Sequence, residues 1–357
     1  MAVPEFAIEG TFFQTDRVSG IARVWTNVLA EWRRDGFLDR IVLFDRGDTM
    51  SQIFDARREL LPARDCTSID GEPELLQMWC DRVGVRAFCS TYYAYPARTP
   101  SVALIHDMIP EVLGFDLAEP MWREKHALIA RARGFVCVSH NTRRDLERLA
   151  PEAAARPIAV AHPGIDPAFT SGEPVDPPSR LEDLGVARDY VVFIGRPSGY
   201  KGFETLFYAV ASLPAEARPQ IVVVGPEDAP AIYVEYLGPG GIVRIHATDD
   251  GIRLLLAHAR AYVAPSRYEG FGLTVLEAMA SGCPVVCSDG GSLPEVAGDA
   301  ALVLPVGDAA AFAAAIDGVR DLRVRNALIV RGLRRAGTFS WRPLADALRE
   351  ALEAAAA

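Results

Sequence analysis

The sequence has 357 residues, of which 50% are hydrophobic, and a formal net charge of −10. This length and hydrophobic content are sufficient for more than one buried core, so we expect two domains. The acidic balance argues against nucleic acid as a partner, and no apolar run reaches the ~18 residues of a membrane span. The start of the chain lacks the features of a signal peptide. Six scattered cysteines without a Cys-x-x-Cys pair predict a reduced, cytoplasmic protein with no zinc site.

Apolar runs alternate with amphipathic segments along most of the chain, which predicts alternating strands and helices. In the N-terminal half we expect strands at 6–8, 41–44, 86–89, 102–105, 135–138 and 158–161, and helices at 20–33, 72–83, 121–133 and 142–149. In the C-terminal half we expect strands at 191–194, 221–225, 242–246, 262–264 and 285–287, with helices between them and a last helix at 341–354. This alternation is typical of an α/β fold with doubly wound parallel sheets. The proline-rich segment 163–178 between the halves predicts a linker.

Two features of the N-terminal half follow expected strands. Gly20 and Ile21 lie in a glycine-containing turn at the start of the expected helix 20–33. His106 and Asp107 follow the expected strand 102–105, and the carboxyl ends of such strands are where open α/β sheets bind ligands. The alternatives are an ordinary loop that enters a helix and a histidine whose hydrogen bonds are satisfied by nearby backbone.

A glycine-rich turn in the C-terminal half, 195–202, follows an expected strand and precedes a helix. It is neither a Walker A loop nor a G-x-G-x-x-G fingerprint. It places Arg196 and Lys201 at a helix N-terminus, where a guanidinium and an ammonium suit phosphate oxygens. Lys201 is one of only two lysines in the chain. The alternative is a basic turn that caps the helix.

A second glycine-rich turn, 266–272, also lies between an expected strand and a helix. Its backbone N–H groups form an anion site at a helix N-terminus. Two carboxylates flank it, Glu269 in the turn and Glu277 in the helix, and such carboxylates accept hydrogen bonds from hydroxyl groups of a sugar or ribose. A nucleotide sugar has both kinds of group, a diphosphate for the backbone N–H groups and hydroxyl groups for the two carboxylates. The alternative for Glu277 is a capping box with Thr274, since the spacing Thr-x-x-Glu fits that motif.

The whole string from Glu269 to Gly282, EGFGLTVLEAMASG, resembles the E-x7-E signature of retaining glycosyltransferases of family four, which have the GT-B fold. The turn 195–202 resembles the diphosphate clamp of the same enzymes. Residues 19–23 match their Gly-Ile-Gly-Arg-like turn in part, with Ala22 where a second glycine is common. The pair formed by His106 and Asp107 resembles one that many relatives place beside the donor sugar.

The resemblance implies two Rossmann-like domains that face each other across a cleft. It implies an acceptor-side domain at 1–165, a nucleotide-sugar domain at 166–340, and a C-terminal helix at 341–357 that packs back on the first domain. The implied catalytic residues are His106, Arg196, Lys201 and Glu269. The implied donor-binding residues are Gly20, Ile21, Arg196, Lys201, Glu269, Gly270, Phe271, Gly272, Leu273, Thr274 and Glu277.

The implied activity is retaining transfer of a hexose from a nucleoside-diphosphate sugar to a hydroxyl of a glycan or lipid-linked acceptor, without a metal or cofactor. The N-terminal motifs look most like those of mannosyl- and rhamnosyltransferases of surface-polysaccharide assembly. GDP-mannose or a related deoxyhexose donor is therefore the first expectation, and UDP- and dTDP-sugars are alternatives. Two other functions stay open, a nucleotide-sugar epimerase of GT-B fold and a non-catalytic partner subunit.

A peripheral contact with the inner face of a membrane is a further expectation, because relatives with lipid acceptors dock through basic faces of the N-terminal half. The candidate here is the expected helix 121–133, with basic residues Arg123, Lys125, Arg131 and Arg133. The alternative is a solvated helix face.

Overall fold

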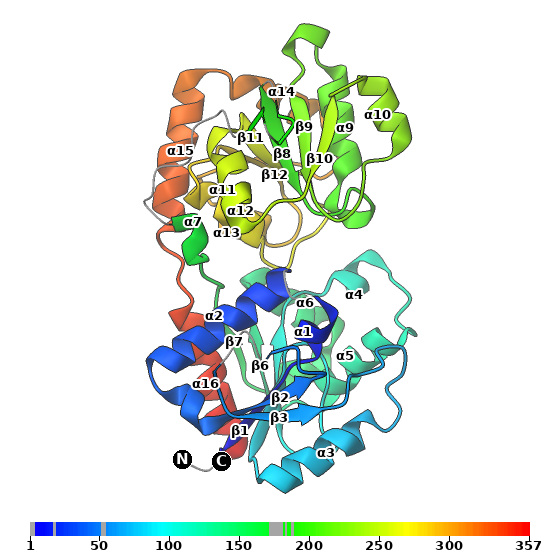
Figure 1. Cartoon of the computed structure of the whole chain (residues 1–357), viewed down its shortest axis with the longest axis vertical. Coiled ribbons are helices and arrows are strands. Elements are labelled where there is room, and N and C mark those ends of the chain that lie inside the picture. Colours follow the sequence, from blue (N-terminus) through cyan, green and yellow to red (C-terminus); the bar gives the residue numbers. More distant parts are fainter. Residues whose placement is uncertain (1–3, 17–18, 51–54, 171–180, 183, 187–188) are drawn as a thin grey trace. The chain divides into compact units, whose positions relative to one another are not determined.

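The computed structural model describes residues 4–16, 19–50, 55–170, 181–182, 184–186 and 189–357. The chain forms two compact units (Figure 1). Unit 1 comprises Met1–Gly164 and Ser340–Ala357, and unit 2 comprises Ile165–Phe339. The expected linker 163–178 contains the short helix α7 (Pro167–Thr170), while its residues 171–178 lie outside the described residues.

Unit 1 is built on a seven-stranded parallel sheet with the strand order β3-β2-β1-β4-β5-β6-β7. The strands are β1 (Phe6–Glu9), β2 (Ile41–Arg46), β3 (Arg58–Leu61), β4 (Ala87–Ser90), β5 (Ser101–Ile105), β6 (Gly134–Cys137) and β7 (Ile158–Val160). The central strands are short apolar runs buried on both faces, as parallel sheets covered by helices require. The strands β2 and β3 are added on one side of β1, and β4 to β7 are added on its other side. The strand order therefore reverses between β1 and β4, and a switch point lies there.

Helices cover both faces of this sheet. They are α1 (Thr11–Thr15), α2 (Gly20–Arg34), α3 (Glu72–Val83), α4 (Ile109–Leu113), α5 (Pro120–Arg131), α6 (His140–Leu149) and α16 (Arg342–Ala356), with 3₁₀ turns at Phe37–Arg40 and Pro151–Ala155. Apolar residues of α3, α5 and α6 pack on one face. The last helix, α16, contacts α2 and strands β4, β5 and β6 (Figure 1). The indole Nε1 of Trp32 on α2 donates to the carbonyl of Ala345 on α16, at 2.9 Å.

Unit 2 contains a six-stranded parallel sheet with the order β10-β9-β8-β11-β12-β13. Its strands are β8 (Tyr190–Ile194), β9 (Gln220–Val224), β10 (Ile242–Ile245), β11 (Ala261–Ala264), β12 (Val285–Ser288) and β13 (Leu302–Leu304). Its helices are α9 (Phe203–Ser212), α10 (Ala231–Leu237), α11 (Asp249–His258), α12 (Leu273–Ala280), α13 (Leu293–Ala297), α14 (Ala309–Gly318) and α15 (Leu322–Ala336), with 3₁₀ turns at Gly199–Lys201 and Ala215–Ala217. The switch point of this sheet lies between β8 and β11.

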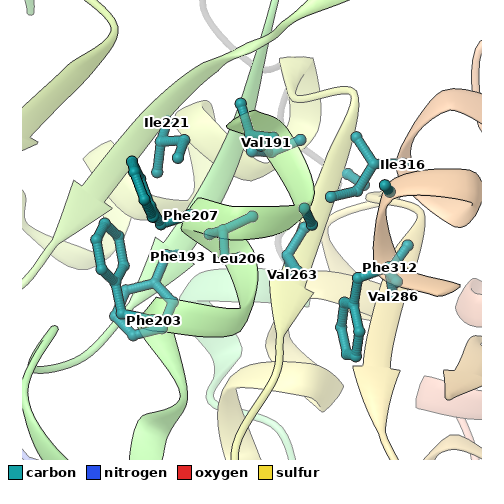
Figure 2. Close-up of a cluster of buried hydrophobic side chains, with 14 of the residues drawn as sticks. Val191, Phe193, Phe203, Leu206, Phe207, Ile221, Val263, Val286, Phe312 and Ile316 are labelled. Carbon is teal, nitrogen blue, oxygen red and sulfur yellow. The ribbon is translucent and has the colours of Figure 1, made fainter. Parts of the chain in front are cut away.

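The core of unit 2 lies between one face of the sheet and the helices α9 and α14. Alternate residues of β8, β9 and β11 point to this face and meet Leu206 of α9 and Phe312 of α14 (Figure 2). The opposite face is covered by α11 and α12: the Tyr190 hydroxyl donates to the carbonyl of Leu255 at 2.7 Å, and the Tyr262 hydroxyl donates to the hydroxyl of Thr274 at 2.7 Å. The strands β8 and β11, each of which is followed by a glycine-rich turn, are therefore packed against helices on both faces.

We expect Leu348→Ala to destabilise unit 1 by about 2–5 kcal/mol, because Leu348 is fully buried on α16 and its loss leaves a cavity. All five tryptophans of the chain, Trp25, Trp32, Trp79, Trp122 and Trp341, lie in unit 1. Tryptophan fluorescence during urea unfolding therefore reports on this unit selectively. Leu60→Ala, at a leucine of unit 1 that is 60% exposed, is the matched control and should change stability by less than about 0.5 kcal/mol. An unchanged midpoint for Leu348→Ala would show that α16 does not support unit 1.

Candidate functional site

Two glycine-rich turns meet at the switch point of unit 2. One follows β8 and the other follows β11, and these strands are hydrogen-bonded neighbours. Gly202 has a φ of +73°, and a Cβ at this position would collide with the carbonyl oxygen of Pro265. The backbone N–H of Arg267 donates to the carbonyl of Tyr200 at 2.7 Å. Only glycine permits both this backbone conformation and this approach, so the sequence of the first turn fixes the position of the second.

The packing of these turns brings Lys201 and Glu269 together. Lys201 Nζ lies 2.8 Å from Glu269 Oε1, and the Ser266 hydroxyl donates to the same oxygen at 2.7 Å. Burial has the largest single effect on the pKa of the Lys201 ammonium and lowers it, but the Glu269 carboxylate, Tyr200 and Tyr262 together raise it more, so the pKa lies above its ordinary value. Lys201 is therefore charged at neutral pH. The sequence pattern predicts that Lys201 binds only an anionic ligand, whereas in the structure Lys201 also forms an ion pair with a carboxylate of the chain.

A third loop, between β12 and α13, supports the Glu269 backbone. Gly291 has a φ of +65°, and a Cβ there would collide with the Glu269 carbonyl. Ser292 donates to that carbonyl through its backbone N–H and its hydroxyl, both at 3.0 Å. The Ser288 hydroxyl donates to the carbonyl of Ser266. Sequence reasoning noted this loop but missed both buried serines, because an isolated serine carries no positional signal.

Glu277 lies on α12 and is only 5% exposed. The N-cap residue of this helix is Gly272, whose φ is +101°, and the N-cap makes no side-chain hydrogen bond. Thr274 is inside the helix and its hydroxyl accepts from Tyr262. The capping-box alternative is therefore wrong, because Thr274 does not occupy the capping position. The glycine turn Gly270–Gly272 opens α12 at Leu273, so the expected helix N-terminus is present at this edge of the sheet.

Arg196, the other expected cation, lies apart from this arrangement. Its side chain is 69% exposed and its nearest acidic group is Glu227, at 3.7 Å. The hydroxyl of Ser198 also donates to Glu227, at 2.6 Å. The structure thus brings Lys201 and Glu269 together in the turns, while Arg196 lies at the solvent-exposed rim beside the turn after β9.

In unit 1, His106 directly follows β5 and is 7% exposed. Burial and the nearby Lys125 ammonium lower the pKa of His106 to about 3, against a smaller raising effect of a hydrogen bond to the Thr91 backbone. Among the described residues, Nε2 of His106 has no hydrogen-bond partner. A neutral imidazole bonded to backbone at one nitrogen keeps the other as an acceptor, so Nε2 of His106 can accept from a ligand hydroxyl if the residues that bury it move aside. Asp107 instead accepts from the backbone N–H of Ile109, at 3.0 Å.

Gly20 and Ile21 form the first residues of α2, whose cap is Ser19. Gly20 is exposed and Ile21 is half-buried, so the turn is accessible. Residues 17 and 18 before it lie outside the described part of the chain. The structure therefore shows the expected helix start.

A network of buried ion pairs at the carboxyl edge of the unit 1 sheet was missed by sequence reasoning. Arg46 contacts Glu9 at 2.7 Å and also Glu72, while Arg64 contacts Glu124 at 2.6 Å. Burial raises the pKa of Glu124 to about 7, although Arg64 opposes the shift. A charged residue at the end of an otherwise apolar strand, as in Phe6–Glu9 and Ile41–Arg46, is the signal that could have found this network.

The basic helix expected at 121–133 differs from the prediction. It spans α5, Pro120–Arg131. Lys125 is fully buried, with Nζ 2.8 Å from Glu111 Oε2 and 3.0 Å from the Asp107 carbonyl. It therefore belongs neither to a solvated face nor to a docking face. Arg123 and Arg131 remain exposed.

Two family models match the chain. Residues 18–169 match the model described as Glycosyltransferase Family 4, and residues 188–320 match the model described as Glycosyl transferases group 1. Among curated proteins, the chain is 32% identical over 265 residues to the O-antigen chain mannosyltransferase B of Escherichia coli, covering 68% of this chain and 67% of that protein. It is 31% identical over 263 residues to an MMP alpha-(1->4)-mannosyltransferase of Mycolicibacterium hassiacum, covering 69% and 63%. The chain thus spans about two thirds of the length of these two relatives.

The fold is shared with solved structures. The Anabaena protein HepE, in complex with UDP and glucose, superposes with a TM-score of 0.75 at 19% identity, covering 98% of this chain and 99% of that one. Two parallel-sheet units of this kind define the GT-B fold. The chain belongs to glycosyltransferase family 4, by its match to the family model and to the mannosyltransferase of Escherichia coli.

No helix within the described part of the chain combines the length and the apolar character needed to cross a bilayer.

We expect acid to destabilise wild-type unit 1 more than the His106→Gln variant. The folded-state pKa of His106, about 3, lies below the ordinary 6.5, so the unfolded chain binds more protons between these values and stability falls as pH drops through this window. Between pH 7 and pH 5, the wild type should lose about 2 kcal/mol more than the variant. Urea unfolding followed by tryptophan fluorescence measures this difference.

Glu124→Gln is the control of opposite sign. The pKa of Glu124 is raised from 4.5 to about 7, so its contribution to stability is present at low pH and is lost as pH rises through that window. This variant should therefore lose more stability than the wild type on acidification from pH 7 to pH 5. Parallel pH profiles for wild type and His106→Gln would contradict the buried, neutral state of His106.

Proposed function

We propose that the protein transfers a hexose from a nucleoside-diphosphate sugar to a hydroxyl of a glycan or lipid-linked acceptor, with retention of the anomeric configuration. The observation that carries this proposal is the Lys201–Glu269 pair, held by two glycine turns at the switch point of unit 2. A cation and a hydroxyl acceptor beside a helix N-terminus match a diphosphate linked to a sugar. Membership of family 4 supports the same reaction class.

Unit 2 would hold the donor. Lys201, Arg196 and the N–H groups of the turn Gly270–Gly272 would stabilise the leaving diphosphate, in the role that a metal has in other transferases. Glu269 would accept a hydrogen bond from a hydroxyl of the donor sugar, and Glu277 from the ribose. Arg196 is 69% exposed and would turn from Glu227 toward the phosphates on binding.

Unit 1 would receive the acceptor. His106, neutral at physiological pH because burial lowers its pKa to about 3, would accept a hydrogen bond at Nε2 from a hydroxyl of the donor sugar. In the reaction, the bond between the anomeric carbon and the diphosphate oxygen breaks, and a bond to the acceptor oxygen forms on the same face. The proton of the acceptor hydroxyl passes to the departing phosphate oxygen, so no protein base is required.

GDP-mannose is the donor that we favour. The two curated relatives named above are mannosyltransferases, one of them for an O-antigen chain. A GDP-linked deoxyhexose is the nearest alternative. A UDP-sugar is a further alternative, supported by the complex of HepE with UDP and glucose, and a dTDP-sugar follows. Surface-polysaccharide assembly is the process that this donor and the Escherichia coli relative together favour.

Two other functions remain as alternatives, an epimerase and a non-catalytic subunit. An epimerase would act on the nucleotide sugar without an acceptor, whereas a non-catalytic subunit would need no charged pair in the donor turns. The intact Lys201–Glu269 pair favours an enzyme that binds a diphosphate.

We place the reaction in the cytoplasm, where an acceptor can be reached at the inner face of the membrane. Any peripheral membrane contact through unit 1 would use the exposed Arg123 and Arg131 of α5, because Lys125 is buried.

A nucleotide panel tests the proposal. We expect one of GDP, UDP, dTDP and ADP to raise the melting temperature of the wild type, since a ligand at ~100 times its Kd adds about 2.7 kcal/mol. We expect Glu277→Ala to weaken binding of that nucleotide about 10- to 150-fold, because a charged hydrogen bond worth about 1.5–3 kcal/mol is lost. Titration calorimetry measures the Kd. Glu204→Ala, at an exposed carboxylate in the first turn of α9, is the matched control, and an unchanged Kd in Glu277→Ala would remove the ribose role.

Lys201→Ala separates a ligand role from a structural one. Removing the ammonium leaves the Glu269 carboxylate, whose side chain is 14% exposed, without its ion-pair partner, so the variant should lose both stability and nucleotide affinity. We expect the double variant Lys201→Ala/Glu269→Gln to recover the stability, because no unpaired charge remains, but not the affinity. Thermal unfolding and nucleotide titration measure the two quantities. Recovery of both would make Lys201 purely structural.

A further inference from the structure

Five aromatic rings form a continuous run at the carboxyl edge of the unit 1 sheet. Neighbouring ring centroids lie 5.2 Å apart for Phe12 and Tyr92, 4.0 Å for Tyr92 and Tyr93, 6.5 Å for Tyr93 and Trp122, and 6.3 Å for Trp122 and Phe115. These distances are those of interacting aromatic pairs. The rings therefore pack against one another in sequence, with the buried Tyr93 in the middle, although they come from distant parts of the chain.

The elements that carry these rings follow the strands β1, β4 and β5. Phe12 lies on α1 after β1, Tyr92 and Tyr93 follow β4, and Phe115 and Trp122 come from the segment after β5. Because β1 and β4 flank the switch point, the run lies where open α/β sheets bind ligands. His106 with its unpartnered Nε2 lies at the end of β5, at the same edge.

The rings are buried to different degrees. Tyr93 is 1% exposed, whereas Phe115 is 41% exposed, and Phe12, Tyr92 and Trp122 are half-buried. Packing on the hydrophobic core of this unit accounts for the buried faces of Tyr92, Tyr93 and Trp122. It does not account for the exposed faces of Phe12, Tyr92, Trp122 and Phe115, which gather at one edge of the sheet.

The described buried cations at this edge already have partners within the chain. Each of them contacts a carboxylate: Arg46 with Glu9 and Glu72, Arg64 with Glu124, and Lys125 with Glu111. A phosphorylated or acidic ligand needs cations that can be redirected to it, and breaking a buried pair leaves an uncompensated charge. To reach one of these described cations, an anionic group would therefore have to displace a carboxylate of the chain.

We propose that this aromatic run is a subsite for the uncharged pyranose rings of a glycan acceptor, an inference that rests on the proposed glycosyl transfer. A pyranose presents C–H groups on its faces, and these carry a small positive charge that complements the negative face of an aromatic ring. Rings with few rotatable bonds also lose little entropy on binding. Tyr92 and Trp122 are the specificity-determining residues, and the acceptor is neutral where it contacts them.

Binding of a linear mannotriose, measured by titration calorimetry and saturation-transfer NMR, tests this subsite without any transfer reaction. Tyr92→Leu and Trp122→Leu keep apolar packing but remove the π face. We expect each to weaken mannotriose binding about tenfold while the Kd of GDP stays unchanged. Trp79→Leu is the matched control, because Trp79 is another half-buried tryptophan of this unit, lying on α3 against Arg82. It should leave mannotriose binding unchanged.

The inference is overturned if wild type does not bind mannotriose, or if Tyr92→Leu and Trp122→Leu bind it as wild type does. It is also overturned if mannose 6-phosphate binds unit 1 more tightly than methyl mannoside. The GDP titration separates this inference from the proposed function. GDP binding without mannotriose binding removes only the acceptor subsite, whereas mannotriose binding without binding of any nucleotide of the panel supports the subsite and contradicts the transferase.

Discussion

The close approach of Gly202 to the Pro265 carbonyl is the contact on which the candidate donor site depends. It brings the turn after β8 against the turn after β11, and the hydrogen bond from Arg267 to Tyr200 fixes their register. Every polar group of the site follows from that packing. Lys201 reaches Glu269 because the two turns touch, and Ser292 secures the backbone of Glu269 from the third loop. A side chain at position 202 would separate the turns and with them the two charges.

The two units use ion pairs in different ways. In unit 2, the Lys201–Glu269 pair lies at an edge that solvent reaches, since the lysine side chain is 24% exposed. A bound anion can therefore share the ammonium with the carboxylate. In unit 1, the pairs around Arg46 and Arg64 are almost fully buried and can only support the sheet edge. The ion pairs of the two units thus differ in solvent access because they differ in burial.

Much of the architecture could be predicted from the sequence, because buried parallel strands are short apolar runs. The helix α3 spans the residues expected for it, Glu72–Val83. The strand β3, Arg58–Leu61, escaped prediction because it is a charged, half-exposed edge strand that lacks an apolar run. Sequence reasoning also located both glycine turns. It could not foresee that Thr274 pairs with Tyr262 rather than capping α12, because that choice is made by tertiary packing and not by local spacing.

The buried network of unit 1 has a consequence for how this protein can be altered. Glu9 receives hydrogen bonds from Thr11, Arg46 and Ser90, and Arg46 in turn contacts Glu72. A single replacement at any of these positions leaves a buried polar partner without its hydrogen bond or ion pair. Simultaneous replacement of several of them by apolar groups of similar volume can be tolerated. The carboxyl edge of the unit 1 sheet should therefore tolerate concerted replacements better than single ones, so a library at this edge should vary these residues together or leave them fixed.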